Sequence, residues 1–315
     1  MKHRTRVLCS FYLLLAAFIW GMAFVSQSKG MDYMGPLTFN GVRSLIGSLV
    51  LALYIFLSGR AAGAKREKRG KTDRGRTFWG GIWCGLALTA ASTLQQYGLQ
   101  YTTVGKAGFI TTLYIIFVPI AGIFFGRRAS KIVWAGTVAA AAGMYLLCMT
   151  ERLSLGRGDI LVFCCAIVFT AHILLVDFFS PGADGVMISC IQFAVCGVLC
   201  TGGALLWEHP TWSQLWEGAG SLAYAGILSC GVAYTLQIIG QKGVNPTVAA
   251  LLLSLESVFA TVSGWIAYRI GFLKTDQTMT GRQILGCILV FGAVILVQLP
   301  QGRRSESGKE QERRA

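Results

Sequence analysis

Long apolar runs recur along almost the whole chain, from Leu8 to Leu299, and they restrict the fold more than any other feature. Each run approaches the roughly 20 residues that an α-helix needs to cross a bilayer. Because backbone polar groups cannot stay unpaired in hydrocarbon, runs of this length predict transmembrane helices. Composition agrees, since 54% of the residues are hydrophobic and only 13% are charged. The sequence therefore predicts an all-α integral membrane protein.

The apolar windows predict ten spans, with an uncleaved first helix because the first run is long and a second span follows it. Their approximate bounds are Leu8–Ser26, Leu37–Leu57, Trp79–Gln96, Lys106–Phe125, Ile132–Met149, Asp159–Phe179, Val186–Trp207, Gly218–Ile239, Pro246–Tyr268 and Arg282–Leu299.

The chain repeats one hydrophobic unit. Gln95–Gly126 and Gln237–Tyr268 each hold an apolar helix, a polar break and a second apolar helix, at an offset of 142 positions. Ala17–Gln27 aligns with Ala166–Val176 at an offset of 149, and the change in offset falls in loops. We expect two halves, residues 1–155 and 156–300, and a disordered cytoplasmic tail over 301–315. Because each half has five spans, the second enters the membrane from the opposite side, which makes an inverted repeat.

The net charge of +14 comes from basic residues in short tracts between the apolar runs. With both termini in the cytoplasm, most of the 28 Lys and Arg residues fall on the inside, as the positive-inside rule requires. The exception is one outer loop that holds Arg269 and Lys274 and ends at Arg282. Such tracts, without a helix-turn-helix or aromatic-basic pattern, argue against a nucleic-acid partner.

No motif for an enzyme, a metal or a cofactor is present in the sequence. The ten cysteines lie in or beside apolar runs without a CxxC pair, which favours a packing role. No phosphate-binding loop, HExxH pair or GxSxG elbow occurs. We therefore expect no enzymatic activity, no cofactor and no metal.

Several segments carry a family resemblance: WGMAFVSQ (Trp20–Gln27), TLQQYGLQYTTVGKAGFITTLY (Thr93–Tyr114), HILLVD (His172–Asp177), GVAYTLQ (Gly231–Gln237) and SLESVFA (Ser254–Ala260). With the two-times-five layout they resemble the EamA-like family of the drug/metabolite transporter superfamily, from about residue 8 to 299. The resemblance implies a bacterial inner-membrane carrier that exports small metabolites or drugs. The chain departs from the family after the fourth span, at Gly126-Arg127-Arg128, and in the longer loop Arg269–Gly281. These departures put loop contacts in doubt more than transport.

Glu256 is the acid expected nearest the middle of an apolar helix. On insertion scales, placing the comparable Asp at the centre of a membrane helix costs about 2.5–3.5 kcal/mol of free energy. It is retained where it faces a polar cavity, pairs with a base or carries a proton. The structural alternative is a protonated Glu that hydrogen-bonds a neighbouring helix. Tyr114 occupies the equivalent place in the first half, so a central acid is present in one half only.

Two further deep residues offer polar contacts. Arg43 could bind an anionic group or neutralise Glu256, although an arginine that extends to the outer interface or caps a neighbouring helix is the favoured interpretation. Its counterpart in the repeat is Gln192. His172 could line a cavity or relay a proton, and a core histidine bonded to a carbonyl fits equally well.

The third and eighth spans end in amides and aromatic residues, which can bind amphipathic solutes or merely anchor the helices at the interface. These residues are Gln95, Tyr97 and Gln237, with Trp20 close to them in the expected arrangement.

The sequence favours a secondary active transporter that works by alternating access around a central cavity, with Glu256 as the proton or cation site. Its expected partners are a small-molecule substrate, a coupling proton and the lipid bilayer, and one chain is sufficient. A non-transporting membrane scaffold or a passive channel stays open as an alternative. Substrate, direction, coupling ion and oligomeric state are also open.

Overall fold

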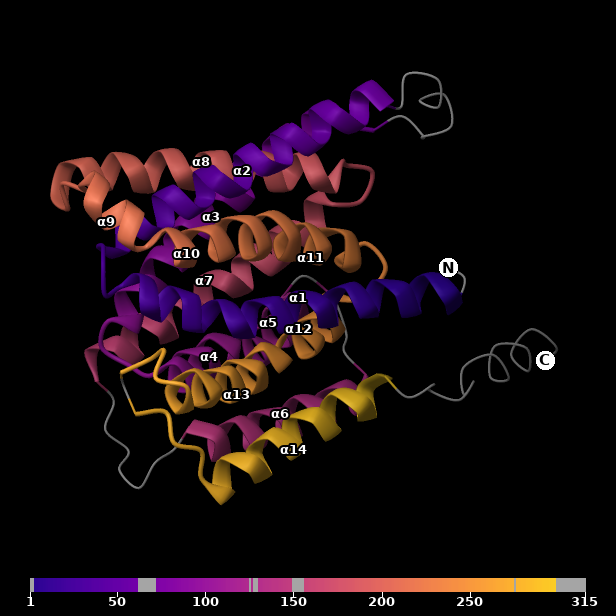
Figure 1. The fold of residues 1–315 in the computed structure, drawn as a ribbon. Coiled ribbons are helices and arrows are strands. Elements are labelled where there is room, and N and C mark those ends of the chain that lie inside the picture. Colours follow the sequence, from indigo (N-terminus) through magenta and orange to yellow (C-terminus); the bar gives the residue numbers. More distant parts are fainter. Residues whose placement is uncertain are drawn as a thin grey trace, which may run out of the picture.

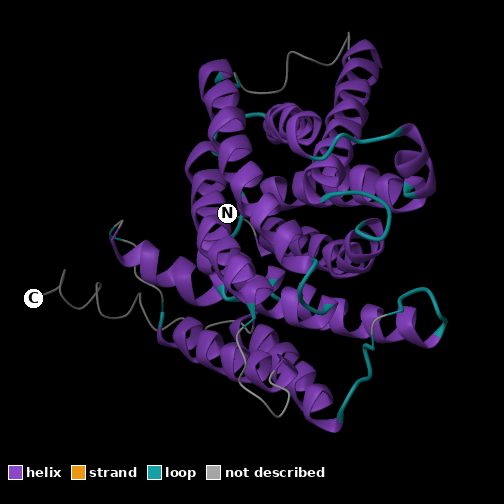
Figure 2. Ribbon diagram, turned by 90° about the vertical axis from the view of Figure 1, so that its left-hand side faces the viewer, coloured by secondary structure: helices purple, strands orange, loops and turns teal. Residues whose placement is uncertain are grey.

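The computed structural model describes residues 3–61, 72–124, 126, 130–148, 156–274 and 276–298. Regular structure within these ranges is helical throughout (Figure 2). The helices are α1 (His3–Gly30), α2 (Pro36–Ala61), α3 (Arg74–Leu99), α4 (Val104–Thr112), α5 (Tyr114–Phe124), α6 (Lys131–Cys148), α7 (Arg157–Phe179), α8 (Gly185–Trp207), α9 (Trp212–Glu217), α10 (Ala219–Ala223), the π-helix η2 (Tyr224–Ala233), α11 (Tyr234–Gln241), α12 (Pro246–Leu253), α13 (Leu255–Arg269) and α14 (Gly281–Gln298). The predicted all-α class is confirmed, whereas the tail expected at 301–315 lies outside the described residues.

Seven helical stretches of the described chain are long and apolar enough to cross a membrane. They comprise α1, α2, α4 with α5, α7, α8, α10 through α11, and α12 with α13. Two shorter apolar stretches lie in α6 and α14. α3 belongs to neither group because its glycine and tryptophan residues and its hydroxyl and amide side chains make it less apolar. The ten predicted spans therefore stay a prediction, although α3 runs among the other helices (Figure 1).

The two largest helix–helix interfaces join α2 to α8 and α6 to α14. Figure 1 shows each pair running side by side. At the second interface the helices approach closely, because a Cβ atom at Gly143 would lie 2.8 Å from the carbonyl oxygen of Gly286. Glycine at such crossings lets helix backbones meet, as small residues do in membrane bundles.

Glu208 joins α8 to α2 at one end of the bundle. Its carboxylate accepts hydrogen bonds from the backbone N–H groups of Leu37 and Thr38, at 2.9 and 2.7 Å. These groups belong to the first turn of α2, whose N–H groups have no partner within the helix. The negative charge also suits the positive end of the helix dipole. One side chain therefore caps the helix and fixes the position of α8.

At the opposite end of the bundle, the start of α3 is bonded to the turn between α7 and α8. Asp73 N–H donates to the carbonyl of Gly182 at 3.1 Å, and Asp184 N–H donates to the Thr77 hydroxyl at 3.1 Å. Arg76 donates to the carbonyls of Phe178 and Phe179. These two segments therefore share one end, and α1 begins and α14 finishes on that same side (Figure 1).

α12 and α13 occupy the centre of the bundle. Every residue of α12 is buried, from Pro246 to Leu253. Around the bundle, by contrast, large apolar side chains such as Leu49 (71% exposed) and Val198 (65%) point outward. A surface of this kind suits contact with lipid.

Candidate functional site

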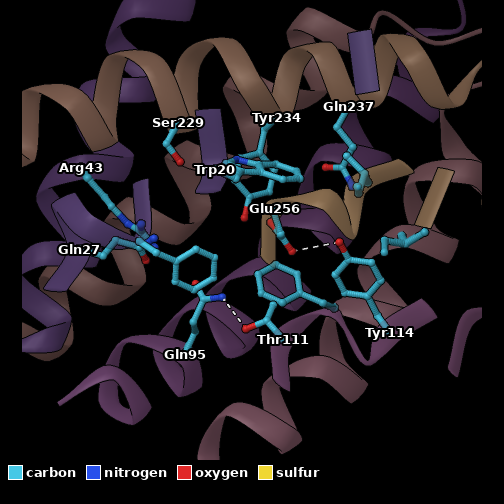
Figure 3. A pocket seen from close by; sticks show the side chains of 14 residues that line it. Trp20, Gln27, Arg43, Gln95, Thr111, Tyr114, Ser229, Tyr234, Gln237 and Glu256 are labelled. Atoms are coloured by element: carbon cyan, nitrogen blue, oxygen red, sulfur yellow. Dashed lines mark hydrogen bonds between the residues drawn. The ribbon is translucent and has the colours of Figure 1, made fainter. Parts of the chain in front are cut away.

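A pocket lies in the interior, where helices from both halves of the chain meet (Figure 3). It encloses about 480 Å³ that no atom fills, counting the space open to its surroundings. The wall combines aromatic rings with amides, hydroxyls, one carboxylate and one guanidinium. Its residues are Trp20, Phe24, Gln27, Arg43, Gln95, Thr111, Tyr114, Phe169, Ile173, Ser229, Tyr234, Gln237, Leu253 and Glu256.

Two broken helices flank the pocket. α4 gives way to α5 at Leu113, and α12 gives way to α13 at Ser254. Around each break the backbone tightens to i→i+3 hydrogen bonds, as from Ile116 N–H to the Leu113 carbonyl and from Ser257 N–H to the Ser254 carbonyl. Hydroxyl groups support these breaks by bonding to local carbonyls, for example Ser254 Oγ to Leu251 O at 2.7 Å.

Glu256 and Tyr114 meet across the pocket, just after the two breaks. The Tyr114 hydroxyl donates to Glu256 Oε1 at 3.0 Å, and both residues are buried (Figure 3). The two positions are separated by 142 residues, the offset that aligns the halves. The only carboxylate in the pocket wall is therefore held by the residue that the sequence aligns with it at this offset.

Gln95 and Arg43 complete the polar part of the wall. Gln95 Nε2 donates to the Thr111 hydroxyl at 3.0 Å, which ties the end of α3 to α4. Arg43 is only 6% exposed, and its guanidinium lies 5.5 Å from the centre of the Phe39 ring. The interpretation that Arg43 extends to the outer interface is therefore wrong. Its side chain points into the bundle because α2 turns this face toward the pocket.

Aromatic rings form the apolar part of the wall. Trp20, Phe24 and Gln27 recur along α1 at four- and three-residue steps, so they share one helix face. The Trp20 ring packs edge-on against Tyr234, with centroids 4.6 Å apart. Tyr234 in turn packs against Phe193 at 5.1 Å. These contacts hold the rings at fixed positions around the polar groups.

The π-helix η2 places two residues in the pocket that an α-helix would separate. Ser229 and Tyr234 both line the wall, and Tyr234 N–H donates to the Ser229 carbonyl in an i→i+5 bond. Residues five apart lie about 140° from each other around an α-helix. The wider π-helical turn brings them onto one face. The irregular segment is thus the reason that both side chains point inward.

This geometry predicts the effect of shortening η2 by one residue. Deletion of Leu228, which is exposed, should relax the segment toward an α-helix and rotate Ser229 away from Tyr234. We expect normal yield of folded protein but loss of solute binding in the pocket. The matched control is deletion of Leu199, which also points outward but lies in the regular α-helix α8. This deletion should abolish folding. Normal solute binding after deletion of Leu228 would contradict the role given to η2.

Similarity to known proteins identifies the chain. The EamA-like transporter family matches residues 7–149 and again residues 156–299. The chain belongs to the EamA-like transporter family. It is 29% identical over 292 residues to an uncharacterized transporter of Archaeoglobus fulgidus, covering 91% of this chain and 84% of the relative. It is 25% identical to the uncharacterized transporter YwfM of Bacillus subtilis, covering 94% and 96% of the two chains.

Two further comparisons agree. The WAT1-related protein At3g02690, chloroplastic, of Arabidopsis thaliana is 21% identical, with coverage of 92% of this chain and 69% of the relative. A crystal structure of a protein with 16% identity superimposes with a TM-score of 0.71, covering 92% of this chain and 96% of the other, and supports the fold alone. Together with the apolar helices, the family makes this chain a multi-pass membrane protein of a transporter family.

The pocket of this EamA-like transporter brings together six of the nine residues that the sequence singled out: Glu256, Tyr114, Arg43, Trp20, Gln95 and Gln237. His172 and Gln192 lie behind the wall instead. Both are fully buried, and His172 Nε2 and Gln192 Oε1 share a hydrogen bond of 3.1 Å. The His172 ring packs against Tyr234 and Phe169, which do line the pocket. Tyr97 is half-buried and lies outside the wall.

Sequence reasoning missed eight wall residues: Phe24, Gln27, Thr111, Phe169, Ile173, Ser229, Tyr234 and Leu253. A signal was available for Gln27, since it lies seven positions after Trp20 on the same face. Tyr234 likewise precedes Gln237 by one turn. Phe169, Ile173 and Leu253 are apolar residues in apolar helices, so nothing in the sequence separates them from packing residues. No group of three or more His, Cys, Asp or Glu residues in the described part could hold a metal ion.

Proposed function

We propose that the protein is a secondary active transporter that exports small metabolites or drugs by alternating access around this pocket. The observation that carries the proposal is the pair of broken helices beside the pocket, one in each half of the chain. Interrupted helices at corresponding positions of two repeats are typical of solute sites in secondary transporters.

The inverted repeat is part of the proposal, and the composition of the wall supports it. At an offset of 142, Gln95 pairs with Gln237 and Thr111 pairs with Leu253, and all four line the pocket. At an offset of 149, Trp20 pairs with Phe169 in the same way. Counterparts gather around one pocket when a pseudo-two-fold axis passes through it.

The packing of the helices gives independent support. An axis of this kind makes some helices pack on their own counterparts, as α2 does on α8 and α6 on α14. The halves 1–155 and 156–300 also agree with the two separate family matches. The start of α3 and the α7–α8 turn lie at the same end of the bundle, as two oppositely oriented halves require. We place this end, with both termini, in the cytoplasm of a bacterial cell, because it carries most of the basic residues.

Glu256 is the proposed proton or cation site. A carboxylate that is 4% exposed and bonded to one phenol can exchange a proton with a solute-filled pocket without leaving the bundle. Gln95, Gln237 and Trp20 would contact the solute, whereas His172 and Gln192 would hold Tyr234 and Phe169 in position. One chain contains the complete pocket, so a monomer is sufficient.

Flux measurements on proteoliposomes test the proposal against its alternatives. A panel of small metabolites and drugs is offered under an imposed pH gradient, with protein-free liposomes as the control. We expect saturable flux of at least one solute, and counterflow when that solute is present on both sides. Flux that stays linear in solute concentration without counterflow would indicate a passive channel. Absence of flux and of binding for the whole panel would indicate a scaffold.

A further inference from the structure

Arg43 is a buried cation without a counterion. Its side chain is 6% exposed, and within the described ranges it forms no ion pair. Its Nε atom is buried without a hydrogen-bond acceptor among the described residues, and its guanidinium lies over the face of Phe39. A buried charge is costly unless it is paired and hydrogen-bonded. An aromatic face supplies only part of that compensation.

Glu256 does not supply the missing charge. It lines the same pocket, but its carboxylate accepts a hydrogen bond from the hydroxyl of Tyr114. Figure 3 shows Arg43 at one end of the pocket beside Gln27, with Glu256 and Tyr114 farther along the wall. The positive and negative groups of the pocket are therefore held apart, and each is open to a different part of a bound solute.

Other buried groups near the pocket also lack hydrogen-bond partners among the described residues. The indole Nε1–H of Trp20 is a buried donor without an acceptor. Gln27 is 4% exposed, and its side-chain Oε1 atom has no hydrogen-bond partner. Flipping the amide would exchange its oxygen and nitrogen and place an N–H donor at this position. Asn40, one turn before Arg43 on α2, has neither side-chain atom bonded. Unpaired buried polar atoms are rare, and Arg43, Gln27 and Trp20 all belong to the pocket wall, which favours a ligand there.

From these observations, and given the proposed transport pocket, we propose that Arg43 and Gln27 form a subsite for an anionic group. The planar guanidinium offers two parallel N–H groups, which match a carboxylate better than a point charge does. The amide N–H group of Gln27 would add a further donor. The anion is either the carboxylate of the transported solute or a free inorganic anion that binds beside it.

The location of the subsite makes the first source chemically reasonable. Phe24, Tyr234 and Phe169 line the same pocket as the two charged groups. A solute with a carboxylate at one end would place its apolar part against these rings. Its other end would then reach toward Glu256, where a hydrogen-bond donor is favoured.

Binding measurements on the full chain in nanodiscs test the subsite without requiring transport. Paired probes differ only in charge: 3-phenylpropionate against 3-phenylpropionamide, and octanoate against octanamide. Sodium chloride and sodium phosphate, titrated into HEPES buffer at constant ionic strength, test the free anion. We expect at least one anion to bind, and a carboxylate to bind more tightly than its amide if the solute is the source. Saturable chloride or phosphate binding without preference for a carboxylate assigns the subsite to the free anion.

Substitutions locate the site. Arg43→Gln should weaken anion binding about 10- to 100-fold, the loss expected for one charge-assisted hydrogen-bonded group. Gln27→Leu, a milder change, should weaken it by a smaller factor and guards against loss of folding in the first variant. Arg282→Gln is the matched control, since the Arg282 guanidinium also lies 5.5 Å from an aromatic centroid, that of Tyr145, but is exposed.

The outcomes separate the subsite from the transport proposal. Anion binding that depends on Arg43 and Gln27 but not on Arg282 supports the subsite, even if no flux is measured. The subsite is overturned if no anion of the panel binds, or if Arg43→Gln and Gln27→Leu bind anions as the wild type does. If these binding results are negative but neutral or cationic solutes are transported, the protein is a transporter without an anion subsite.

Discussion

Replacing Glu256 with Gln is expected to abolish the part of solute flux that a pH gradient drives. Glutamine keeps the volume of the side chain and can still accept the hydrogen bond of the Tyr114 hydroxyl. It cannot release or take up a proton, so solute movement loses its coupling. In proteoliposomes, accumulation against a concentration gradient should fall to the level of protein-free liposomes, while solute counterflow is retained.

The matched control is Glu217→Gln. Glu217 is an exposed residue of α9 that accepts a hydrogen bond from the Ser213 hydroxyl at 2.8 Å. The same change of charge far from the pocket should leave flux unaltered. If Glu256→Gln still accumulated solute in response to a pH gradient, Glu256 would be a packing residue and the coupling site would lie elsewhere.

A single methyl group at Gly21 is expected to destabilise the bundle strongly. The Cβ of Gly21→Ala would lie 2.9 Å from both the Ala260 nitrogen and the Glu256 carbonyl oxygen, and closer still to the Phe259 side chain. α1 and α13 would have to separate at the level of Glu256. Overpacking of this kind costs about 1–3 kcal/mol, and the melting temperature should fall accordingly.

Gly202→Ala provides the contrast for this experiment. Apart from its neighbours along α8, no atom lies within 4 Å of a Cβ placed at Gly202, in the second-last turn of that helix. Alanine is favoured over glycine within helices by about 1 kcal/mol. Thermal unfolding of the purified variants, followed by tryptophan fluorescence in one detergent, should therefore show a loss for Gly21→Ala and no loss for Gly202→Ala. Equal stability of both variants would mean that α1 and α13 are not in close contact at this level.

Hydrophobicity predicts the helices of this chain well because lipid leaves the backbone few other choices. It does not predict how they are interrupted. The break at Ser254 depends on hydroxyl groups that bond to carbonyls within one turn, and serine occurs in many unbroken membrane helices. The π-helical hydrogen bonds of η2 likewise depend on packing against α2 rather than on a local motif.

A polar residue of the site was predictable where its depth in the membrane helix is enough to place it in the interior, as for Glu256. Arg43 was misinterpreted because a long side chain can extend from the same depth either to the interface or to the interior. His172 has the depth of a wall residue but points to Gln192, since the direction of a side chain depends on helix rotation. Such rotations are fixed by contacts between distant parts of the chain, which a single sequence does not specify.

The hydrogen bond between Tyr114 and Glu256 has a consequence for how such a protein could arise. In the proposed arrangement these two residues are counterparts, so an assembly of two identical first halves would set phenol against phenol. Two identical second halves would set carboxylate against carboxylate, which repel unless one is protonated. A mixed pair at the centre requires two genes or one fused gene, and fusion alone guarantees that unlike halves always meet.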